Sequence, residues 1–250
     1  MDAAAGGRSS AERAHLPWGR AARTLARVDT LRSRLGLGAL ARWVSPGDGG
    51  LRRGRLAVVV ACGYVLFGGT YLPINFFSVG RAAHQLWLPG EARIPLVPEF
   101  EYLYVLTYLL PLGLVAWLPD ARRFRRTGLA FALTLGVAYT TYLLFPVYLE
   151  RPVLEVGSVA TYLLSLEYHD PSYNHLPSLH VAISWLVYLA CRDAVRLGGV
   201  FLALVIGISI STVFVKQHYV VDVLTGALLA AGAWAAAGRW ERRGAAPGER

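Results

Sequence analysis

Long apolar segments alternate with short polar ones along most of this chain. Six apolar runs are long enough, or nearly long enough, to cross a lipid bilayer as helices. They lie at roughly 56–79, 100–118, 128–149, 178–192, 197–215 and 219–238. The fourth run is the shortest and begins with polar residues, but residues 183–190 are apolar on every face of a helix. The pattern predicts an all-α polytopic membrane protein, built as a bundle of six transmembrane helices.

The composition agrees with membrane insertion. The chain has 250 residues, of which 55% are hydrophobic and only 16% charged. Soluble domains carry roughly a quarter of charged residues. Its two cysteines, Cys62 and Cys191, have neither CxxC nor metal-binding spacing. The sequence therefore predicts no disulfide and no cysteine metal site.

Positive charge is confined to alternate connecting segments. The basic segments are residues 1–55, 119–127, the link at 192–196 and the tail after residue 238. The segments 80–99 and 150–177 are balanced or acidic instead. This alternation follows the positive-inside rule and predicts a multi-pass protein of the cell membrane with both termini cytoplasmic. A nucleic-acid surface would not alternate in register with the spans, so the net charge of +9 does not indicate a nucleic-acid partner.

The same pattern divides the chain into three parts. Residues 1–50 are predicted to form a disordered basic cytoplasmic tail, because they are rich in Ala, Arg, Gly and Ser. A basic helix near 20–43 that lies on anionic lipid and a solvated tail without a role are both compatible with this segment. Residues 51–240 form the six-span domain, with its core motifs at 142–226, and residues 241–250 form a cytoplasmic C-terminal tail.

Strongly polar residues gather at the span ends that the charge pattern places outside the cell. Arg151 follows the third span, and His180 lies in the first turn of the fourth. Lys216 and His218 follow the fifth span, and Asp222 lies in the first turn of the sixth. The charge count assigns this face without using these residues. The sequence therefore predicts a site that faces the extracytoplasmic side.

His218 and Asp222 are four residues apart at the start of a helix, which puts them on one face about 6 Å apart. A carboxylate at that distance accepts a proton from one imidazole nitrogen and leaves the other as a nucleophilic lone pair. A boundary histidine followed by a helix-capping aspartate gives the same pattern without any chemistry. An ionisable group at membrane depth is costly, however, and is by default a functional candidate.

The other polar groups fit the recognition of a phosphate ester. Ser178 and His180 lie at a helix N-terminus, where free amides favour an anion and a histidine can protonate a departing alkoxide. Arg151 and Lys216, the single lysine of the chain, supply fixed cations for phosphate oxygens. A capping serine, an interfacial histidine and snorkelling cations are the corresponding structural interpretations.

The loop 168–176 contains further candidates. His169, Tyr173 and His175 lie there, and they are predicted either to line a substrate entrance or to stabilise the loop. Segment 153–167 is amphipathic and predicts a short helix over the site.

These residues resemble the type 2 phosphatidic acid phosphatase superfamily, over roughly residues 100–235. Arg151-Pro152 matches the end of its first motif, and Pro177-Ser178-Leu179-His180 matches the second, with Leu179 in place of glycine. Ser211-Thr212 and His218 to Asp222 match the third. Leu144 and Thr212 stand where that family has a lysine and an arginine. The pattern with Lys216-Gln217-His218 is closest to the branch of inositol phosphorylceramide synthases and their bacterial relatives.

The resemblance implies an integral membrane lipid phosphatase with a phosphohistidine intermediate. His218 would attack phosphorus, Asp222 would orient its ring, and His180 would protonate the leaving oxygen and then activate water. Arg151, Lys216 and Ser178 would hold the phosphate oxygens. This scheme needs neither a metal nor another cofactor, and its partners would be a lipid phosphate substrate and membrane lipids.

Other functions stay open at this stage. The same intermediate can pass a phospho-headgroup, such as inositol phosphate, to an alcohol, which would make the protein a phosphotransferase. A non-catalytic transporter or scaffold with polar helix ends is a second alternative. Metal binding by His180, His218 and Asp222 is a third, but the cations Arg151 and Lys216 would repel a metal ion.

Overall fold

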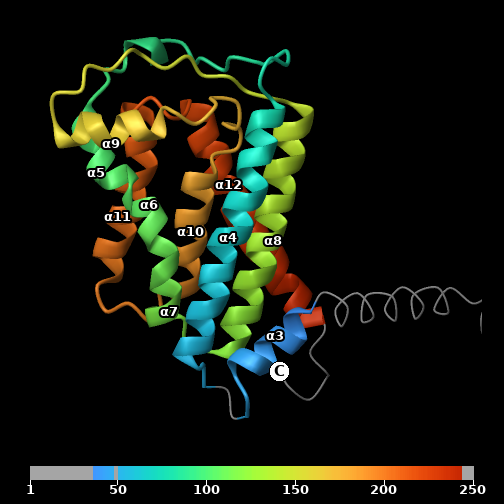
Figure 1. Cartoon of the computed structure of the whole chain (residues 1–250). Helices are drawn as coiled ribbons and strands as arrows, with labels where there is room; N and C mark the ends of the chain where they lie inside the picture. Colours follow the sequence, from blue (N-terminus) through green and yellow to red (C-terminus); the bar gives the residue numbers. More distant parts are fainter. Residues whose placement is uncertain (1–35, 48–49, 244–250) are drawn as a thin grey trace, which may run out of the picture.

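A computed structural model describes residues 36–47 and 50–243 of the chain. Within these ranges every regular element is a helix, and β structure is limited to isolated bridges such as that between His84 and Val147. The helices are α3 (Leu37–Val44), α4 (Arg53–Phe77), α5 (Glu101–Tyr104), α6 (Leu106–Leu109), α7 (Gly113–Trp117), α8 (Ala121–Leu144), α9 (Val159–Glu167), α10 (Leu179–Cys191), α11 (Gly198–Phe214) and α12 (Val220–Arg243). Short 3-10 turns lie at Glu91–Arg93, Pro98–Phe100 and Leu110–Leu112. Figure 1 shows the long helices side by side as a bundle.

Four helical segments in the described part of the chain are long and apolar enough to cross a membrane. They are Arg53–Phe77, Pro98–Trp117, Ala121–Leu144 and Val220–Arg243. The other two apolar helices, α10 and α11, have 13 and 17 residues. At 1.5 Å per residue α10 rises only about 20 Å, which is less than the roughly 30 Å of a hydrocarbon core. The regular structure of residues 36–47 and 50–243 is all helical, and the protein is a multi-pass membrane protein, whereas the six-span arrangement stays a prediction.

The second long segment changes its helical pitch several times. It runs through the turn Pro98–Phe100, α5, α6, the turn Leu110–Leu112 and α7. Pro111 lies in the tighter turn, because proline has no amide hydrogen and crowds the preceding turn of an α-helix. At Gly113 a Cβ atom would lie 2.7 Å from the Trp117 ring, so the ring folds back over this position. Tyr104, Thr107 and Tyr108 of this segment all lie within hydrogen-bond distance of His180 in α10.

The basic segment 119–127, predicted as a loop, is instead largely the first part of α8. The side chain of Asp120 caps this helix by accepting a hydrogen bond from the Arg123 amide at 2.7 Å. Arg123 bridges to Asp193 at 2.6 Å, and Arg126 lies over the Trp234 ring, 4.0 Å from its centroid. With their charges partnered in this way, the arginines continue the helix rather than interrupt it. At its other end α8 stops two residues before Pro146, where a following proline disfavours helix.

The ordered chain also extends into the predicted tail. Helix α3 packs on α8 and α4, and it buries Ala41 and Val44. The predicted helix near 20–43 falls largely on residues 1–35, which lie outside the described residues, as do residues 244–250 of the C-terminal tail.

Helix α10 lies inside the bundle and contacts α8, α11, α12 and the α6–α7 region. Its residues Val181, Leu186 and Val187 are fully buried. The start of α10 approaches α12 very closely, since a Cβ atom at Gly226 would lie 2.5 Å from the Ser178 carbonyl oxygen. The Ser178 amide also donates to the Asp222 carbonyl at 3.1 Å. This close contact fixes the first turns of both helices relative to each other.

Loops and a short helix cover the end of the bundle where these first turns meet. Helix α9 lies across this end in Figure 1, opposite α3. It starts at a capping box formed by Ser158 and Thr161, six residues later than the amphipathic pattern of 153–167 predicts. The segment after α9 then leads to the first turn of α10 and passes over the histidine site.

Candidate active site

Two imidazoles from distant parts of the chain meet beneath this cover. His180 projects from the first turn of α10, and His218 lies in the short link between α11 and α12. His180 Nδ1 is 3.1 Å from His218 Nε2, and the ring centroids are 5.3 Å apart. The predicted juxtaposition of the two histidines is therefore present in the structure.

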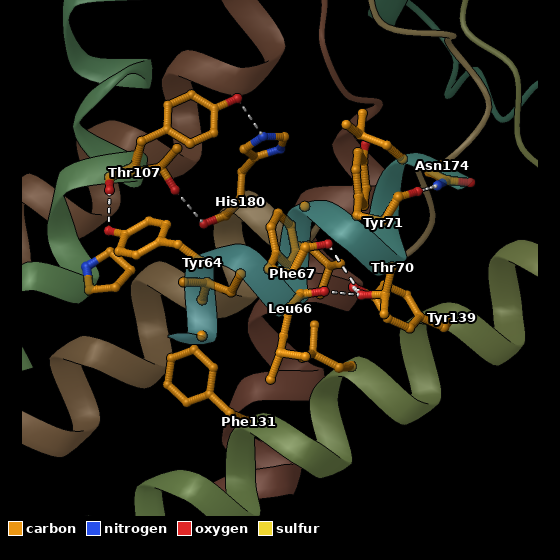
Figure 2. A pocket seen from close by; sticks show the side chains of 18 of the residues that line it. Tyr64, Leu66, Phe67, Thr70, Tyr71, Thr107, Phe131, Tyr139, Asn174 and His180 are labelled. Carbon is orange, nitrogen blue, oxygen red and sulfur yellow. Dashed lines mark hydrogen bonds between the residues drawn. The ribbon is translucent and has the colours of Figure 1, made fainter. Parts of the chain in front are cut away.

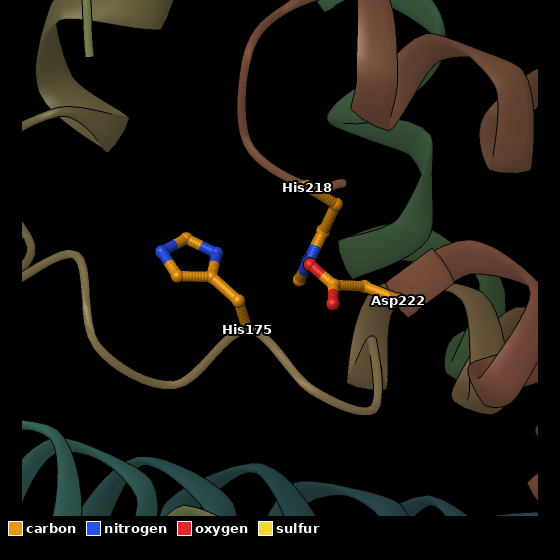
Figure 3. Close-up of side chains that lie close together, drawn as sticks. All are labelled: His175, His218 and Asp222. Carbon is orange, nitrogen blue, oxygen red and sulfur yellow. The ribbon is translucent and has the colours of Figure 1, made fainter. Parts of the chain in front are cut away.

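Asp222 lies on the other side of His218. Its Oδ2 is 3.4 Å from His218 Nδ1 and accepts a hydrogen bond from the Tyr219 amide at 2.9 Å. Figure 3 shows the carboxylate beside the His218 ring and His175 facing the same ring. Asp222 is fully buried, and its Oδ1 has no hydrogen-bond partner among the described residues. The carboxylate is thus positioned to orient His218.

Burial keeps His218 neutral. Loss of solvent, with a smaller contribution from the Arg151 guanidinium, lowers the pKa of His218 to about 3. A neutral ring whose Nδ1 hydrogen points to Asp222 has its lone pair on Nε2, the nitrogen that faces His180. His218 therefore has the protonation state of a nucleophile at neutral pH.

His175 forms the third imidazole of this cluster. Its ring meets that of His218 edge-on, with centroids 5.3 Å apart. His175 Nδ1 lies 2.7 Å from the Gln217 carbonyl oxygen, and Nε2 lies 2.8 Å from Ser172 Oγ. Burial lowers the pKa of His175 to about 3. The His175 side chain is only 3% exposed, so it packs against His218 in the interior of the protein and not at a solvent-exposed entrance.

Three side chains with potential metal-ligand atoms lie close together at this site. The potential ligand atoms of His175, His218 and Asp222 lie within 4.8 Å of one another. A histidine binds a metal through a nitrogen lone pair. His175 Nδ1 donates to the Gln217 carbonyl, and Nε2 lies against Ser172 Oγ, so a metal ion could reach this ring only by displacing one of these groups. These residues fit a hydrogen-bonded cluster better than a ligand set.

Arg151 brings a positive charge to the same place. Its Nη2 donates to Gln217 Oε1 at 2.7 Å, and Nη1 donates to the Asp170 carbonyl at 2.6 Å. Both Arg151 Nε and Gln217 Nε2 are buried and lack a hydrogen-bond partner within the described part of the chain. Two unsatisfied donors beside two imidazoles are costly unless an anion accepts from them. This pair forms the best candidate for holding phosphate oxygens.

Lys216 and Ser178 have local structural roles in this structure. The Lys216 ammonium donates to the Ile94 carbonyl in an outer loop, and burial lowers its pKa, while Glu91 opposes this shift. Lys216 adopts a left-handed backbone with φ 53°. Ser178 is the N-cap of α10 and accepts from the Val181 amide. The structure thus brings Arg151, and not Lys216, to the histidine pair.

The remaining predicted residues lie in the outer loops. His169 Nδ1 is 2.6 Å from the Ser165 carbonyl at the end of α9, and this contact is exposed. The Tyr173 ring packs against Tyr148, and its hydroxyl is 3.5 Å from the Gly80 amide. A role of these residues at a substrate entrance stays a prediction.

Sequence reasoning missed a group of hydrogen-bonding side chains around His180. Tyr104 Oη is 2.9 Å and Tyr108 Oη 3.2 Å from His180 Nε2. Tyr108 also donates to Glu167 Oε2 at 2.8 Å. A signal was present, because residues 104 and 108 are four apart and so lie on one helix face.

An apolar cavity of about 750 Å³ opens from the histidine pair into the bundle. Figure 2 shows His180 and Asn174 near residues of α4 and α8 that line it. Along α4 the lining reaches from Leu72 down to Leu56, which is about 24 Å at 1.5 Å per residue. Leu118 and Phe124 lie at the same deep end. The cavity therefore extends through most of the thickness of a hydrocarbon core.

The mouth of the cavity is polar and carries two acids. Glu167 and Asp170 line it together with Arg151. Burial raises the pKa of both carboxyl groups, while Arg151 lowers each. Asp170 accepts a hydrogen bond from Asn75 at 2.8 Å. A long apolar interior that ends at charged groups and two imidazoles fits an amphipathic molecule with a polar head.

Comparison with known proteins assigns the chain to a family. The chain is 33% identical over 132 residues to an uncharacterized protein of Methanocaldococcus jannaschii, and the match covers 51% of this chain and 54% of that protein. The chain thus spans about half the length of this relative. No solved structure matches the chain. The family model of the PAP2 superfamily matches residues 75–236, more than half of the chain and all of the histidine site, and the chain therefore belongs to the PAP2 superfamily.

Proposed function

We propose that the protein is an integral membrane lipid phosphatase that cleaves a phosphate ester or diphosphate through a phosphohistidine on His218, without a metal ion. Membership of the PAP2 superfamily supports a phosphoric ester hydrolase or phosphotransferase in general terms. The observation that carries the specific proposal is the direct juxtaposition of His180 Nδ1 and His218 Nε2, 3.1 Å apart, at the polar mouth of an apolar cavity.

The reaction proceeds in two steps, formation and hydrolysis of the phosphohistidine. In the first, His218 Nε2 forms a bond to phosphorus while the ester P–O bond breaks, and the leaving oxygen takes the Nδ1 proton of neutral His180, which becomes an imidazolate, a weaker base than the alkoxide. In the second, water gives a proton to His180 as its oxygen bonds to phosphorus, and the P–N bond breaks to release phosphate. Asp222 stabilises the positive ring of phosphorylated His218, and Arg151 and Gln217 hold the equatorial oxygens.

Substrate binding has to replace the hydrogen bond between the two histidines. A phosphoryl group in line with both nitrogens does not fit into a gap of 3.1 Å. The unsatisfied Arg151 Nε and Gln217 Nε2 offer partners to the incoming oxygens, which compensates for the lost contact.

The cavity supplies the support for a lipid substrate. With the phosphate at the histidine pair, a hydrocarbon tail would lie against Tyr71, Phe67 and Gly63 of α4 and point toward the deep end. Burial of apolar surface favours binding by roughly 25 cal/mol per Å², so a long tail adds affinity that a soluble phosphate cannot obtain.

The proposal places the site on the extracytoplasmic face with both termini in the cytoplasm. In the structure the histidine site and the arginine-rich start of α8 lie at opposite ends of the bundle, which supports this orientation. A phosphatase reporter fused after residue 250 tests it, because such a fusion is active only outside the cytoplasm. An active fusion would reverse the orientation.

Direct detection of the intermediate tests the mechanism. Purified protein is mixed with lipid phosphates and diphosphates labelled at the terminal phosphate, quenched within milliseconds and analysed for protein-bound label. We expect acid-labile, alkali-stable label on His218, its absence in His218→Ala, and turnover that EDTA does not reduce. Product release without a labelled intermediate would refute covalent catalysis, and strong EDTA inhibition would refute the metal-free scheme.

A phosphotransferase is the second candidate, and the two acids at the cavity mouth favour it. The Glu167 and Asp170 carboxylates accept hydrogen bonds from hydroxyl groups, and an alcohol bound there would compete with water for the phosphohistidine. This activity would agree with the resemblance to the branch of inositol phosphorylceramide synthases. Mass spectrometry of the products with and without inositol or glycerol separates the two candidates, because only transfer yields a new phosphoester.

A further inference from the structure

We propose that Tyr104 is a positioning residue that fixes the acid proton of His180 on Nδ1, the nitrogen that faces His218. The inference rests on the proposed function, in which His180 protonates the leaving oxygen. It assigns a role to a fully buried hydroxyl of the second long helical segment that lies within hydrogen-bond distance of His180.

Counting hydrogens along the chain of contacts gives the direction of each hydrogen bond. The Asp222 carboxylate can only accept, so His218 Nδ1 carries its ring hydrogen and Nε2 has the lone pair. The contact of 3.1 Å between His218 Nε2 and His180 Nδ1 then needs a hydrogen on His180. A neutral His180 with its hydrogen on Nδ1 has a lone pair on Nε2, which must accept a hydrogen bond.

Two phenols are close enough to donate to His180 Nε2, but one of them is already committed. Tyr108 has a single hydroxyl hydrogen, and the Glu167 carboxylate takes it at 2.8 Å. Tyr104, at 2.9 Å, is therefore the donor to His180 Nε2. The order of donation runs from Tyr104 to His180, then to His218 and finally to Asp222.

Removal of the Tyr104 hydroxyl reverses this order at His180. The Tyr108 oxygen, 3.2 Å from Nε2, keeps free lone pairs while its hydrogen points to Glu167. In the substrate complex, where the phosphoryl group has replaced the contact between the two histidines, the favoured contact without Tyr104 is a hydrogen bond from His180 Nε2 to Tyr108. That tautomer leaves a bare Nδ1 toward the substrate, so the leaving oxygen receives no proton.

The inference is tested by the dependence of the first step on the leaving group. Phosphohistidine formation is measured in single turnovers with p-nitrophenyl phosphate, whose leaving group departs as an anion, and with octyl phosphate, whose alkoxide needs a proton. We expect Tyr104→Phe to slow the reaction with octyl phosphate about 100-fold or more, the usual contribution of a general acid. The rate with p-nitrophenyl phosphate should stay within about threefold of wild type.

Tyr108→Phe is the matched control, because it removes the same atom four residues along the same helical face. It should change the two rates by a similar factor, since the Tyr108 hydrogen serves Glu167. Equal slowing of both substrates by Tyr104→Phe, or a selective effect of Tyr108→Phe, would overturn the assignment. A wild-type protein that forms no phosphohistidine with either substrate would instead refute the proposed function.

The tautomer can also be observed without any variant of Tyr104. In protein labelled with ¹⁵N-histidine, protonated and lone-pair nitrogens have well separated chemical shifts, and the loss of a signal in His180→Asn assigns this ring. A hydrogen on Nδ1 of His180 at neutral pH is the expected result. A hydrogen on Nε2 would overturn the inference even if Tyr104→Phe fails to fold.

Discussion

His175 holds the backbone of Gln217, the residue directly before the proposed nucleophile. Its Nδ1 lies 2.7 Å from the Gln217 carbonyl oxygen, and its ring meets the His218 ring edge-on. Since the carbonyl only accepts, His175 donates from Nδ1, while its Nε2 lies 2.8 Å from Ser172 Oγ. One side chain thus links the loop after α9 to the link between α11 and α12.

The first prediction concerns this link. His175→Ala removes the hydrogen bond to Gln217 and leaves a buried carbonyl unsatisfied, which costs roughly 1–3 kcal/mol and frees the backbone next to His218. We expect the rate of phosphohistidine formation to fall by about tenfold or more, because small displacements of a reacting group cost much of the rate. His169→Ala, a change at the exposed loop histidine, serves as control and should leave the rate unchanged. Equal rates for both variants would show that His175 does not position the nucleophile.

The second prediction separates the two cations. Arg151→Lys keeps the charge but loses the Nε donor and the planar fork, so we expect KM for a lipid phosphate to rise about tenfold. Lys216→Met should leave kcat/KM within about threefold of wild type, because the ammonium of Lys216 contacts Ile94 instead of the histidine pair. Steady-state kinetics of the two variants show which of the two cations binds the phosphate. The reverse result would assign phosphate binding to Lys216, as the sequence predicts.

Most of the fold was readable from the sequence because burial in lipid leaves a strong signal. The six apolar runs coincide with α4, the segment 98–117, α8, α10, α11 and α12, with the largest shift, seven residues, at the start of α8. The start of α8 was misjudged, since a run of arginines reads as a loop although Asp120 caps it and Arg126 packs on Trp234. A run of arginines shows where the membrane ends, but the start of a helix depends on its capping residue, which is Asp120 in α8.

The candidate site divides in the same way. That His180, His218 and Asp222 lie together could be predicted from their spacing and their place at span ends, and their catalytic roles stay a prediction. Tyr104 and Gln217 were not found, because their roles depend on which atoms they face across the bundle. Lys216 was expected to bind phosphate from its nearness in sequence to His218; its ammonium contacts the Ile94 carbonyl in the structure, and its role at the phosphate stays a prediction.

The third prediction concerns pH. Burial and Arg151 lower the pKa of His218 to about 3, so the nucleophile is neutral at all pH values above that. The groups that face His218 are His175, His180, Asp222 and Arg151. We therefore expect the ¹⁵N signals of the His218 ring to stay those of a neutral imidazole when the pH is lowered through 6.5, the ordinary pKa of histidine. A titration of protein labelled with ¹⁵N-histidine checks this directly, with His218→Ala to assign the ring, and a transition centred near 6.5 would show that His218 is not shielded as described.

The fourth prediction tests the tail-binding role of the cavity. Gly63 lies about midway along α4 and lines the cavity, and a Cβ atom there would meet nothing within 4 Å. Gly63→Leu would therefore fill the cavity without a clash, and leucine is a better helix former than glycine by roughly 1 kcal/mol. We expect kcat/KM for a long-chain lipid phosphate to fall about tenfold or more, as for a substrate that loses part of its apolar pocket. Short soluble phosphates should react as with wild type.

Gly69→Leu provides the control for this variant. Gly69 lies on the same helix and has as much room for a side chain, but it does not contribute to the cavity wall among the residues that the structure describes. Its substitution should leave both substrates unaffected. A uniform loss with all substrates in Gly63→Leu would indicate a change in the bundle rather than a filled tail site. Unchanged activity toward long chains would show that the tail stays in the surrounding lipid, in which case only the phosphate end of the substrate is bound by the protein.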